Sequence, residues 1–185
     1  MLTDTLQFVL DTLLQSYAAL LLLRFHMQWL RSPMRNPLGD FVMLLTNPLV
    51  LRARRYIPTA WGLDSASLLL TAAVEMLYLA ATLYLHSFPI SVLPLFAWML
   101  VKLLKLSVYL LMGALFIEAL LSWTNPHTPL AAVLSSITRP FLRPLRRFVP
   151  PAGGIDFSFL ILFFVCQLIL MLPLAWLEGL VLRAL

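Results

Sequence analysis

Four long apolar stretches dominate this sequence and leave few folds open to it. They lie at about residues 6–30, 65–86, 103–123 and 157–180. Since a helix rises about 1.5 Å per residue, about 20 residues cross the hydrocarbon core of a bilayer. Hydrophobic residues make up 62% of the 185-residue chain, which is more than a soluble core of this size can bury. We therefore predict an all-α integral membrane protein with about four transmembrane helices.

A motif that occurs twice, 92 residues apart, divides the chain. Residues 46–70 read TNPLVLRARRYIPTAWGLDSASLLL and residues 138–162 read TRPFLRPLRRFVPPAGGIDFSFLIL. Matches in one ungapped register indicate an internal duplication. The matching pairs are Thr46/Thr138, Pro48/Pro140, Arg54/Arg146, Arg55/Arg147, Pro58/Pro150, Gly62/Gly154 and Asp64/Asp156. We predict two parallel repeats, residues 1–88 and 89–185, each with a connecting segment between its two spans.

Each connecting segment opens with a helix-start signal, because Asn36-Pro37 and Thr128-Pro129 are typical of an N-cap followed by proline. Residues 38–45 and 130–137 are too short to cross a bilayer, so we expect interfacial or re-entrant helices there. Pro48 is expected to start a second short helix, which Pro58 ends.

The end of the motif predicts how the next span begins. Gly62 and Gly154 supply a turn, and Asp64 and Asp156 cap the following helix. Pro58 and Pro150 bound the surface helix before that turn. Residues 87–101, with two prolines, fit either a short surface helix or an extension of the third span.

The arginines of the motif suggest a lipid-facing surface. At 100° per residue, those of the second copy fall within about a 100° arc, and apolar side chains cover the opposite arc. This pattern is typical of a helix in the headgroup layer that binds anionic lipid or a protein partner. The candidate binding residues are Arg54, Arg55, Arg139, Arg143, Arg146 and Arg147. Pro144 argues for a later helix start, and a loop that only sets topology is the alternative.

Charge distribution predicts the orientation of the protein. The two connecting segments hold nine of the thirteen Lys and Arg residues, five in the first and four in the second. Cytoplasmic loops are enriched in these residues, so we expect both segments in the cytoplasm and both termini on the opposite face. The formal charge of +5 indicates anionic headgroups and not nucleic acid, because the arginines lie beside apolar spans.

Polar residues inside the spans form a second candidate site. Glu75 and Gln167 each lie eleven residues after the motif aspartate, about 16 Å into their helices. Arg24 and Glu118 each lie five residues before a tryptophan, which favours an ion pair between them. Such groups usually face the bundle interior. They fit either an ion or proton path or contacts that fix helix registry. Similar placement is expected for Gln7, Asp11 and Gln15.

Catalytic patterns are missing from the sequence. His26, His86 and His127 are scattered, without carboxylates or thiols at metal-ligand spacing, and Cys166 stands alone in an apolar run. There is no nucleophile elbow, phosphate-binding glycine loop or zinc-protease motif. We therefore expect no enzyme activity, no cofactor and no metal.

The duplicated T-x-P…R-R-x-x-P…G-x-D motif, with its N-P or T-P helix start, resembles the bacterial YggT family, whose plastid and Gram-positive relatives are called YlmG. The resemblance covers the whole chain as two tandem family domains. Arg52 replaces Pro144 of the second copy, and Trp61 replaces Gly153. The family implies a bacterial cytoplasmic (inner) membrane protein without catalysis. Its members are linked to osmotic-stress tolerance, to cell-division genes and, in plastids, to haem-protein assembly and nucleoid distribution.

Together these observations favour an accessory or assembly protein that binds anionic lipids and either a membrane-protein partner or a second copy of itself. An ion or osmolyte transporter or channel component is the alternative, because of the polar residues within the spans.

Overall fold

The fold was analysed in a computed structural model that describes residues 1–58, 63–89, 91–125, 127–149 and 156–184. The described part of the chain is all helical. Four helical units are long and apolar enough to cross a membrane, as predicted. They are α1–η1–α2 (Leu2–Leu10, Asp11–Gln15, Ser16–Trp29), α4 (Ser65–Leu85), α5 (Val92–Thr124) and α7–η2–α8 (Ser158–Ile169, Leu170–Leu174, Ala175–Leu182). The η segments are single π-helical turns within the first and last units.

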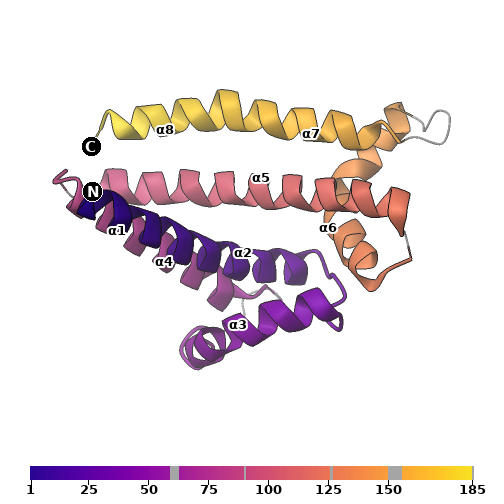
Figure 1. Cartoon of the computed structure of the whole chain (residues 1–185), viewed down its shortest axis with the longest axis horizontal. Coiled ribbons are helices and arrows are strands. Elements are labelled where there is room, and N and C mark those ends of the chain that lie inside the picture. The colour runs from indigo at the N-terminus through magenta and orange to yellow at the C-terminus, as the bar shows by residue number, and fades with distance from the viewer. Residues whose placement is uncertain (59–62, 90, 126, 150–155, 185) are drawn as a thin grey trace.

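Helix α5 runs through the middle of the bundle (Figure 1). The unit α7–η2–α8 lies on one side of it, and α1–η1–α2 with α4 lies on the other. Both described chain ends lie at one end of the bundle, whereas α6 (Pro129–Phe148) lies at the opposite end. The chain runs in the same direction along α1–α2 and α5, and in the reverse direction along α4 and α7–α8.

Helices α3 (Pro37–Ala53) and α6 form the connecting segments. Each begins at the predicted cap: the Asn36 side chain accepts a hydrogen bond from the Gly39 N–H at 3.0 Å, and Thr128 Oγ1 accepts one from the Ala131 N–H at 3.2 Å. These bonds satisfy N–H groups that have no partner inside the helix.

Both connecting helices continue through their internal prolines, so the prediction that Pro48 starts a new helix is wrong. Pro48 lies inside α3, and Pro140 and Pro144 lie inside α6. The first helix also ends at Ala53 and not at Pro58. Proline removes one backbone hydrogen bond and strains the turn before it. Packing offsets this cost: α3 buries Val42, Thr46 and Val50, and α6 buries Ile137, Thr138 and Leu142. The segments 38–45 and 130–137 are therefore the first halves of longer helices.

Of the two alternatives for residues 87–101, the structure shows the extension of the third span. Helix α5 begins at Val92 and is 33 residues long, about 50 Å. The extension packs on α4 through Leu79, Leu83, Leu95 and Met99. Burial of these side chains explains why a helix forms across Pro94, near its first turn.

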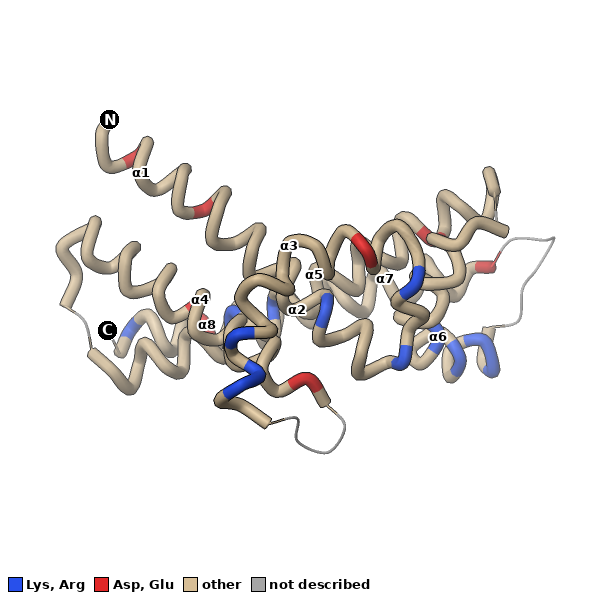
Figure 2. Tube along the Cα trace, turned by 90° about the horizontal axis from the view of Figure 1, so that it is seen from below, with Lys and Arg blue, Asp and Glu red and all other residues tan. Residues whose placement is uncertain are grey.

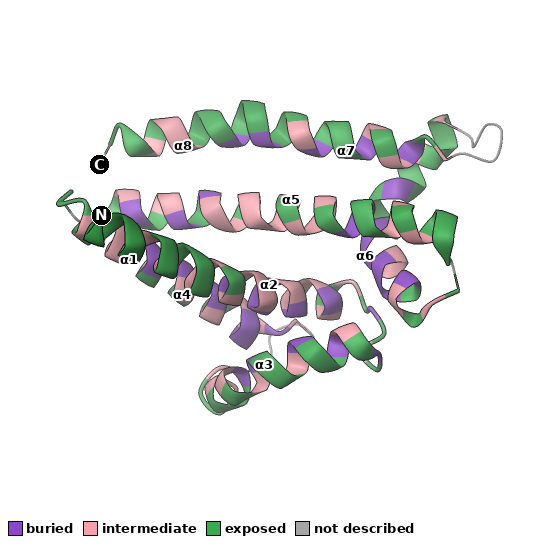
Figure 3. Cartoon of the chain, viewed as in Figure 1, coloured by how far each residue is buried: buried purple, intermediate pink, exposed green. Residues whose placement is uncertain are grey.

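Each connecting helix packs on the two spans that flank it. Val50 of α3 clusters with Leu21 of α2 and Ala66 of α4. In the second half, Leu142 of α6 clusters with Leu115 of α5 and with α7. Val50 and Leu142 are 92 residues apart, so equivalent positions of the motif make equivalent contacts. The outer face of α7–α8 is exposed along its length (Figure 3), which suits a lipid-facing helix.

Candidate functional site

The motif arginine and the motif aspartate of each copy bind each other. Arg54 Nε and Nη2 donate to the two carboxylate oxygens of Asp64 at 3.3 and 2.9 Å. In the second copy, Arg146 Nε donates to Asp156 Oδ2 at 2.8 Å. The ten-residue separation is the same in both. Each pair therefore ties the end of a connecting helix to the start of the next span.

The aspartates also accept hydrogen bonds from N–H groups where the next spans begin. Asp64 accepts from the Ser67 N–H at 3.4 Å and from Ser67 Oγ at 2.5 Å, at the N-cap of α4. Asp156 accepts from the Ser158 N–H at 3.0 Å, where α7 begins. Asp64 is the predicted N-cap of α4. In the second copy Phe157 is the N-cap of α7, and Asp156, one residue earlier, binds only the first N–H of the helix. Gly62, Pro150 and Gly154 lie outside the described residues, and Pro58 is exposed after the end of α3.

Both carboxyls are stabilised in the charged form. Burial opposes ionisation of Asp64, but hydrogen bonds from Arg54 and Ser67 outweigh it and lower the pKa of Asp64. Burial likewise opposes ionisation of Asp156, and bonds from Ser158 and Arg146 lower its pKa. Both are therefore anions at neutral pH, opposite their arginines.

Arg24 of α2 is the buried cation of the first half, with 3% of its surface exposed. Its Nη1 donates to Thr46 Oγ1 at 2.7 Å and to Asn47 Oδ1 at 2.8 Å, and its Nε lies 3.5 Å from Asp64 Oδ2. That Nε makes no hydrogen bond within the described ranges, so its contact with Asp64 is electrostatic. The motif of the first half thus supplies all of these partners of Arg24.

The predicted Arg24–Glu118 ion pair is wrong. Glu118 of α5 accepts a hydrogen bond from Thr138 Oγ1 of α6, whereas Arg24 binds its own half of the chain. Equal depth in the membrane does not determine which way a side chain points around its helix. Thr46 and Thr138 are 92 residues apart, and each binds the charged residue of the preceding span.

A polar seam runs along the interface between the first span and α4. On α4 it comprises Asp64, Ser67, Thr71, Glu75, Tyr78 and Thr82, spaced three or four residues apart, so they share one face. From residue 64 to 82 they extend about 27 Å along the helix. This stripe could have been identified in the sequence from its spacing, although only Asp64 and Glu75 were predicted.

The other side of the polar seam is made by the predicted residues of the first span. Gln15 donates to Glu75 Oε2 at 3.1 Å. Tyr78 donates to Asp11 Oδ1 at 2.8 Å, and Gln7 donates to the same oxygen at 2.7 Å. Glu75 is completely buried, and its second oxygen has no hydrogen-bond partner among the described residues.

The second half does not repeat this seam. Gln167 is half-buried and makes no side-chain hydrogen bond within the described ranges. The polar contacts instead lie nearer the chain ends, where Glu178 of α8 accepts from Trp98 Nε1 at 3.0 Å and binds Lys105 and Lys102 of α5. Sequence reasoning missed Glu178, whose lysine partners are on another helix. The halves therefore share the motif contacts and differ in their interiors.

Most of the predicted binding arginines are at the surface. Arg55, Arg139, Arg143, Arg146 and Arg147 are exposed, and Arg54 is half-buried. Figure 2 shows Lys and Arg residues gathered at α6 and at the end of α3. The second arginine of each pair makes no ion pair in the part of the chain that the structure describes, unlike the first. No cluster of three or more His, Cys, Asp or Glu residues suitable for a metal occurs there either.

These features define a multi-pass helical membrane protein whose connecting helices are held to its spans by charged motif residues. A family model described as CCB3/YggT matches residues 3–85 and 97–177, and the chain belongs to this family.

An Escherichia coli K12 protein described as uncharacterized protein YggT is 37% identical over 162 residues, which cover 86% of this chain and 84% of the relative. An uncharacterized Pseudomonas aeruginosa protein is 33% identical over 169 residues, 89% of this chain and 86% of its own. An uncharacterized Haemophilus influenzae protein is 30% identical over 165 residues, 89% and 88% of the two chains. No solved structure matches this chain.

Proposed function

We propose that this protein is a non-enzymatic accessory or assembly factor of the bacterial cytoplasmic membrane. It binds anionic lipid headgroups and protein partners through the arginines of its two connecting helices. The observation that carries the proposal is the surface of α6. Four arginines there are exposed, while Val133, Leu134, Ile137 and Leu142 of the same helix are buried. The apolar face of α6 packs on α2 and α5 inside the protein, which leaves the arginines facing outward, where lipid phosphates can bind them.

The proposed orientation places α3 and α6 in the cytoplasm and both termini across the membrane, because the connecting segments hold nine of the thirteen Lys and Arg residues. The two halves are proposed as parallel repeats, residues 1–88 and 89–185. Support for this comes from the matching contacts of Arg54 with Asp64 and of Arg146 with Asp156.

The test separates binding arginines from structural ones. Arg146 is left intact because it binds Asp156, and Arg139, Arg143 and Arg147 are replaced together by Gln. A Lys replacement at the same three positions is the matched control, since it keeps the charge and changes the geometry. At about 1 kcal/mol per cation near an anionic surface, the Gln variant should lose roughly 100-fold in headgroup affinity.

The readouts are the lipids retained by the purified full-length protein and the proteins crosslinked to it in native membranes. The Gln variant should retain less anionic phospholipid and fewer partners, and the Lys variant should resemble the wild type. If the Gln variant keeps the lipids and every crosslinked partner of the wild type, the arginine surface is not a binding surface.

The polar seam favours a second candidate function, passage of a proton, ion or small solute. Glu75 is buried at mid-span with one oxygen unbound, and intramembrane carboxylates often belong to transport paths. A cavity of about 300 Å³, lined by residues that include Thr82 and His86, lies at one end of the seam. Proteoliposomes that show a flux abolished by Glu75→Gln would support this function, and the absence of any flux would count against it.

A further inference from the structure

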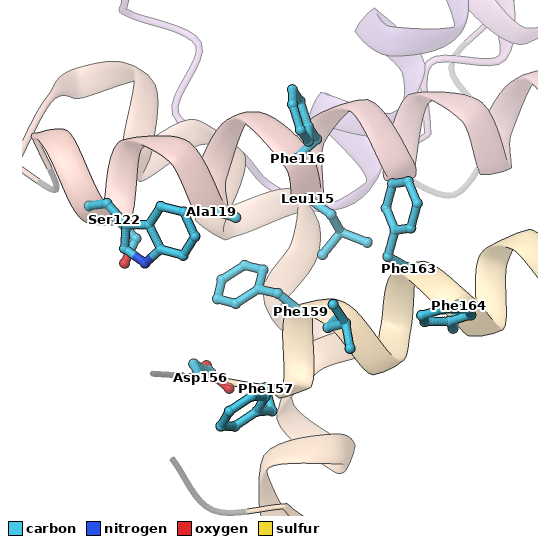
Figure 4. Close-up of a pocket in the computed structure, with 11 residues that line it drawn as sticks. Leu115, Phe116, Ala119, Ser122, Asp156, Phe157, Phe159, Phe163 and Phe164 are labelled. Carbon is cyan, nitrogen blue, oxygen red and sulfur yellow. The ribbon is translucent and has the colours of Figure 1, made fainter. Parts of the chain in front are cut away.

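A groove between α5 and α7 distinguishes the second half of the protein (Figure 4). Its volume is about 550 Å³, within the range of roughly 300–1,000 Å³ typical of ligand sites. The lining is almost wholly apolar, with Leu115, Phe116, Phe163 and Phe164 toward one end. Polar side chains occur only toward the other end, where α5 finishes and α7 begins.

The groove follows from a difference between the two motif copies. Three of its phenylalanines replace small polar residues of the first half: Phe157, Phe159 and Phe163 stand where the first copy has Ser65, Ser67 and Thr71. Ser67 and Thr71 are completely buried where α4 packs against α2, because small side chains let helices approach closely. The second half therefore has aromatic rings at positions where the first half has small polar side chains, and Phe163 projects from α7 toward α5.

A cationic group lies at the polar end of this groove. Asp156 lines the groove and binds Arg146, whose guanidinium also lies 5.5 Å from the ring centre of Phe159, another lining residue. Arg146 uses only its Nε for Asp156, and its two terminal nitrogens make no hydrogen bond within the described residues. Arg54, its counterpart, uses both Nε and a terminal nitrogen on Asp64. Exposed Arg143 and Arg147 add two more positive charges on the same helix.

We infer that the α5–α7 groove is a binding site for one anionic phospholipid, with one of its two acyl chains against the phenylalanines and its phosphate on Arg146. The inference rests on the proposed recognition of anionic headgroups and adds a defined site and stoichiometry to it. The three arginines at this end of α6 outnumber two nearby carboxyls, Asp156 and Glu118, which both interact with Arg146, and the remaining positive charge complements a phosphate.

The size of the groove favours an acyl chain over a helix of another protein. From Leu115 to Trp123 it follows eight residues of α5, about 12 Å. A transmembrane helix of another protein is about 30 Å long, so a groove this short would hold less than half of its length. A hydrocarbon chain is narrower, and it lies naturally with its head toward the membrane surface.

The experiment fills the groove and counts bound lipid. The purified full-length protein is mixed with equal amounts of phosphatidylglycerol and phosphatidylcholine, and native mass spectrometry reports which lipids remain bound. Ala119→Trp places a large ring inside the groove, and Leu104→Trp, at an exposed apolar position elsewhere on α5, is the matched control. Ser122→Trp obstructs the polar end at an exposed position, so it tests the site even if Ala119→Trp does not fold.

The wild type and Leu104→Trp should retain one phosphatidylglycerol per chain. Retention should fall roughly tenfold in Arg146→Gln, the effect of losing one charge-assisted hydrogen bond. It should fall at least as far in the groove variants, because the Trp ring occupies the space of the acyl chain. Unchanged retention in the groove variants, or equal retention of the two lipids by the wild type, would overturn the inference. A change of oligomeric mass on filling the groove would also overturn it and assign the groove to a second copy.

The variants that fill the groove leave the surface arginines unchanged, so failure of the groove inference and failure of the proposed function can be distinguished. If groove variants keep their lipid while the Arg139, Arg143 and Arg147 variant loses lipid and partners, the groove inference fails and the proposed function stands. If filling the groove removes the lipid while the arginine variant retains all its partners, the groove is a lipid site and the proposed function fails.

Discussion

Replacing Asp64 by Asn should destabilise the protein far more than the same change at Asp156. The Asp64 side chain is completely buried between Arg54 and the buried Arg24. Removing one partner of a buried ion pair costs about 3–5 kcal/mol, because the remaining charge keeps its desolvation penalty. Asp156 and Arg146 are 23% and 42% exposed, so their pair contributes about 0–1 kcal/mol. Asn keeps a side-chain oxygen that can accept the hydrogen bond from the Ser158 N–H, so loss of this bond adds little.

Thermal and denaturant unfolding of the purified proteins in one detergent measures this difference. We expect Asp64→Asn to lower the free energy of unfolding by about 2–5 kcal/mol more than Asp156→Asn does. A double-mutant cycle with Arg24→Leu identifies the cause, because residues in one charged network do not contribute additively. Equal losses for the two aspartate variants, or strict additivity of Arg24→Leu and Asp64→Asn, would refute the assignment of a buried charge cluster.

Three further predictions concern stability, measured by the same unfolding assay. Gly39→Ala should lower the free energy of unfolding by about 1–3 kcal/mol, because a Cβ atom would lie 2.2 Å from a backbone carbonyl oxygen. Gly113→Ala, with open space around it, is the control. Equal effects of the two changes would contradict this account. Glu75→Leu should lower the free energy of unfolding by about 1–3 kcal/mol, because it leaves Gln15 unpaired. Replacing both Gln15 and Glu75 by Leu should be nearly neutral. A double variant less stable than the single one would show that the pair itself is stabilising. The lowered pKa of Asp64 means that its stabilisation is present above the ordinary aspartate pKa of 3.8 and is lost as pH falls through the lower folded value. Acid should therefore destabilise the wild type below about pH 4 and affect Asp64→Asn less, and identical pH curves would contradict the role of this carboxyl.

The spans and helix caps could be predicted because they depend on local properties of the chain. About 20 consecutive apolar residues are enough to predict a span, and Asn36 and Thr128 satisfy N–H groups only three residues away. The continuity of α3 across Pro48 could not be predicted in this way. It depends on burial of Val42 and Val50 against other helices, and tertiary packing commonly overrides local propensity.

The partners of the charged residues were harder to predict, since they depend on rotation about the helix axis and on the return of the chain. Arg24 and Glu118 were expected at similar depths, yet each binds the connecting helix of its own half. Asp64 was predicted as a cap, which it is, but its ion pair with Arg54 requires the chain to turn back after α3. By contrast, the spacing of the polar seam on α4 was present in the sequence, and a search for polar stripes at helical spacing would have found it.

The two halves show how one motif can bind a positive residue in one span and a negative residue in the other. Thr46 accepts a hydrogen bond from the Arg24 guanidinium and donates to the Val42 carbonyl, whereas Thr138 donates to the Glu118 carboxylate. A hydroxyl is both donor and acceptor, so the same threonine binds either sign of charge without a change in the motif. The charged residue in the span can therefore differ between the copies while the contact with the connecting helix is kept. With that contact constant, the interface beyond it has become a closed polar seam in one half and an open apolar groove in the other.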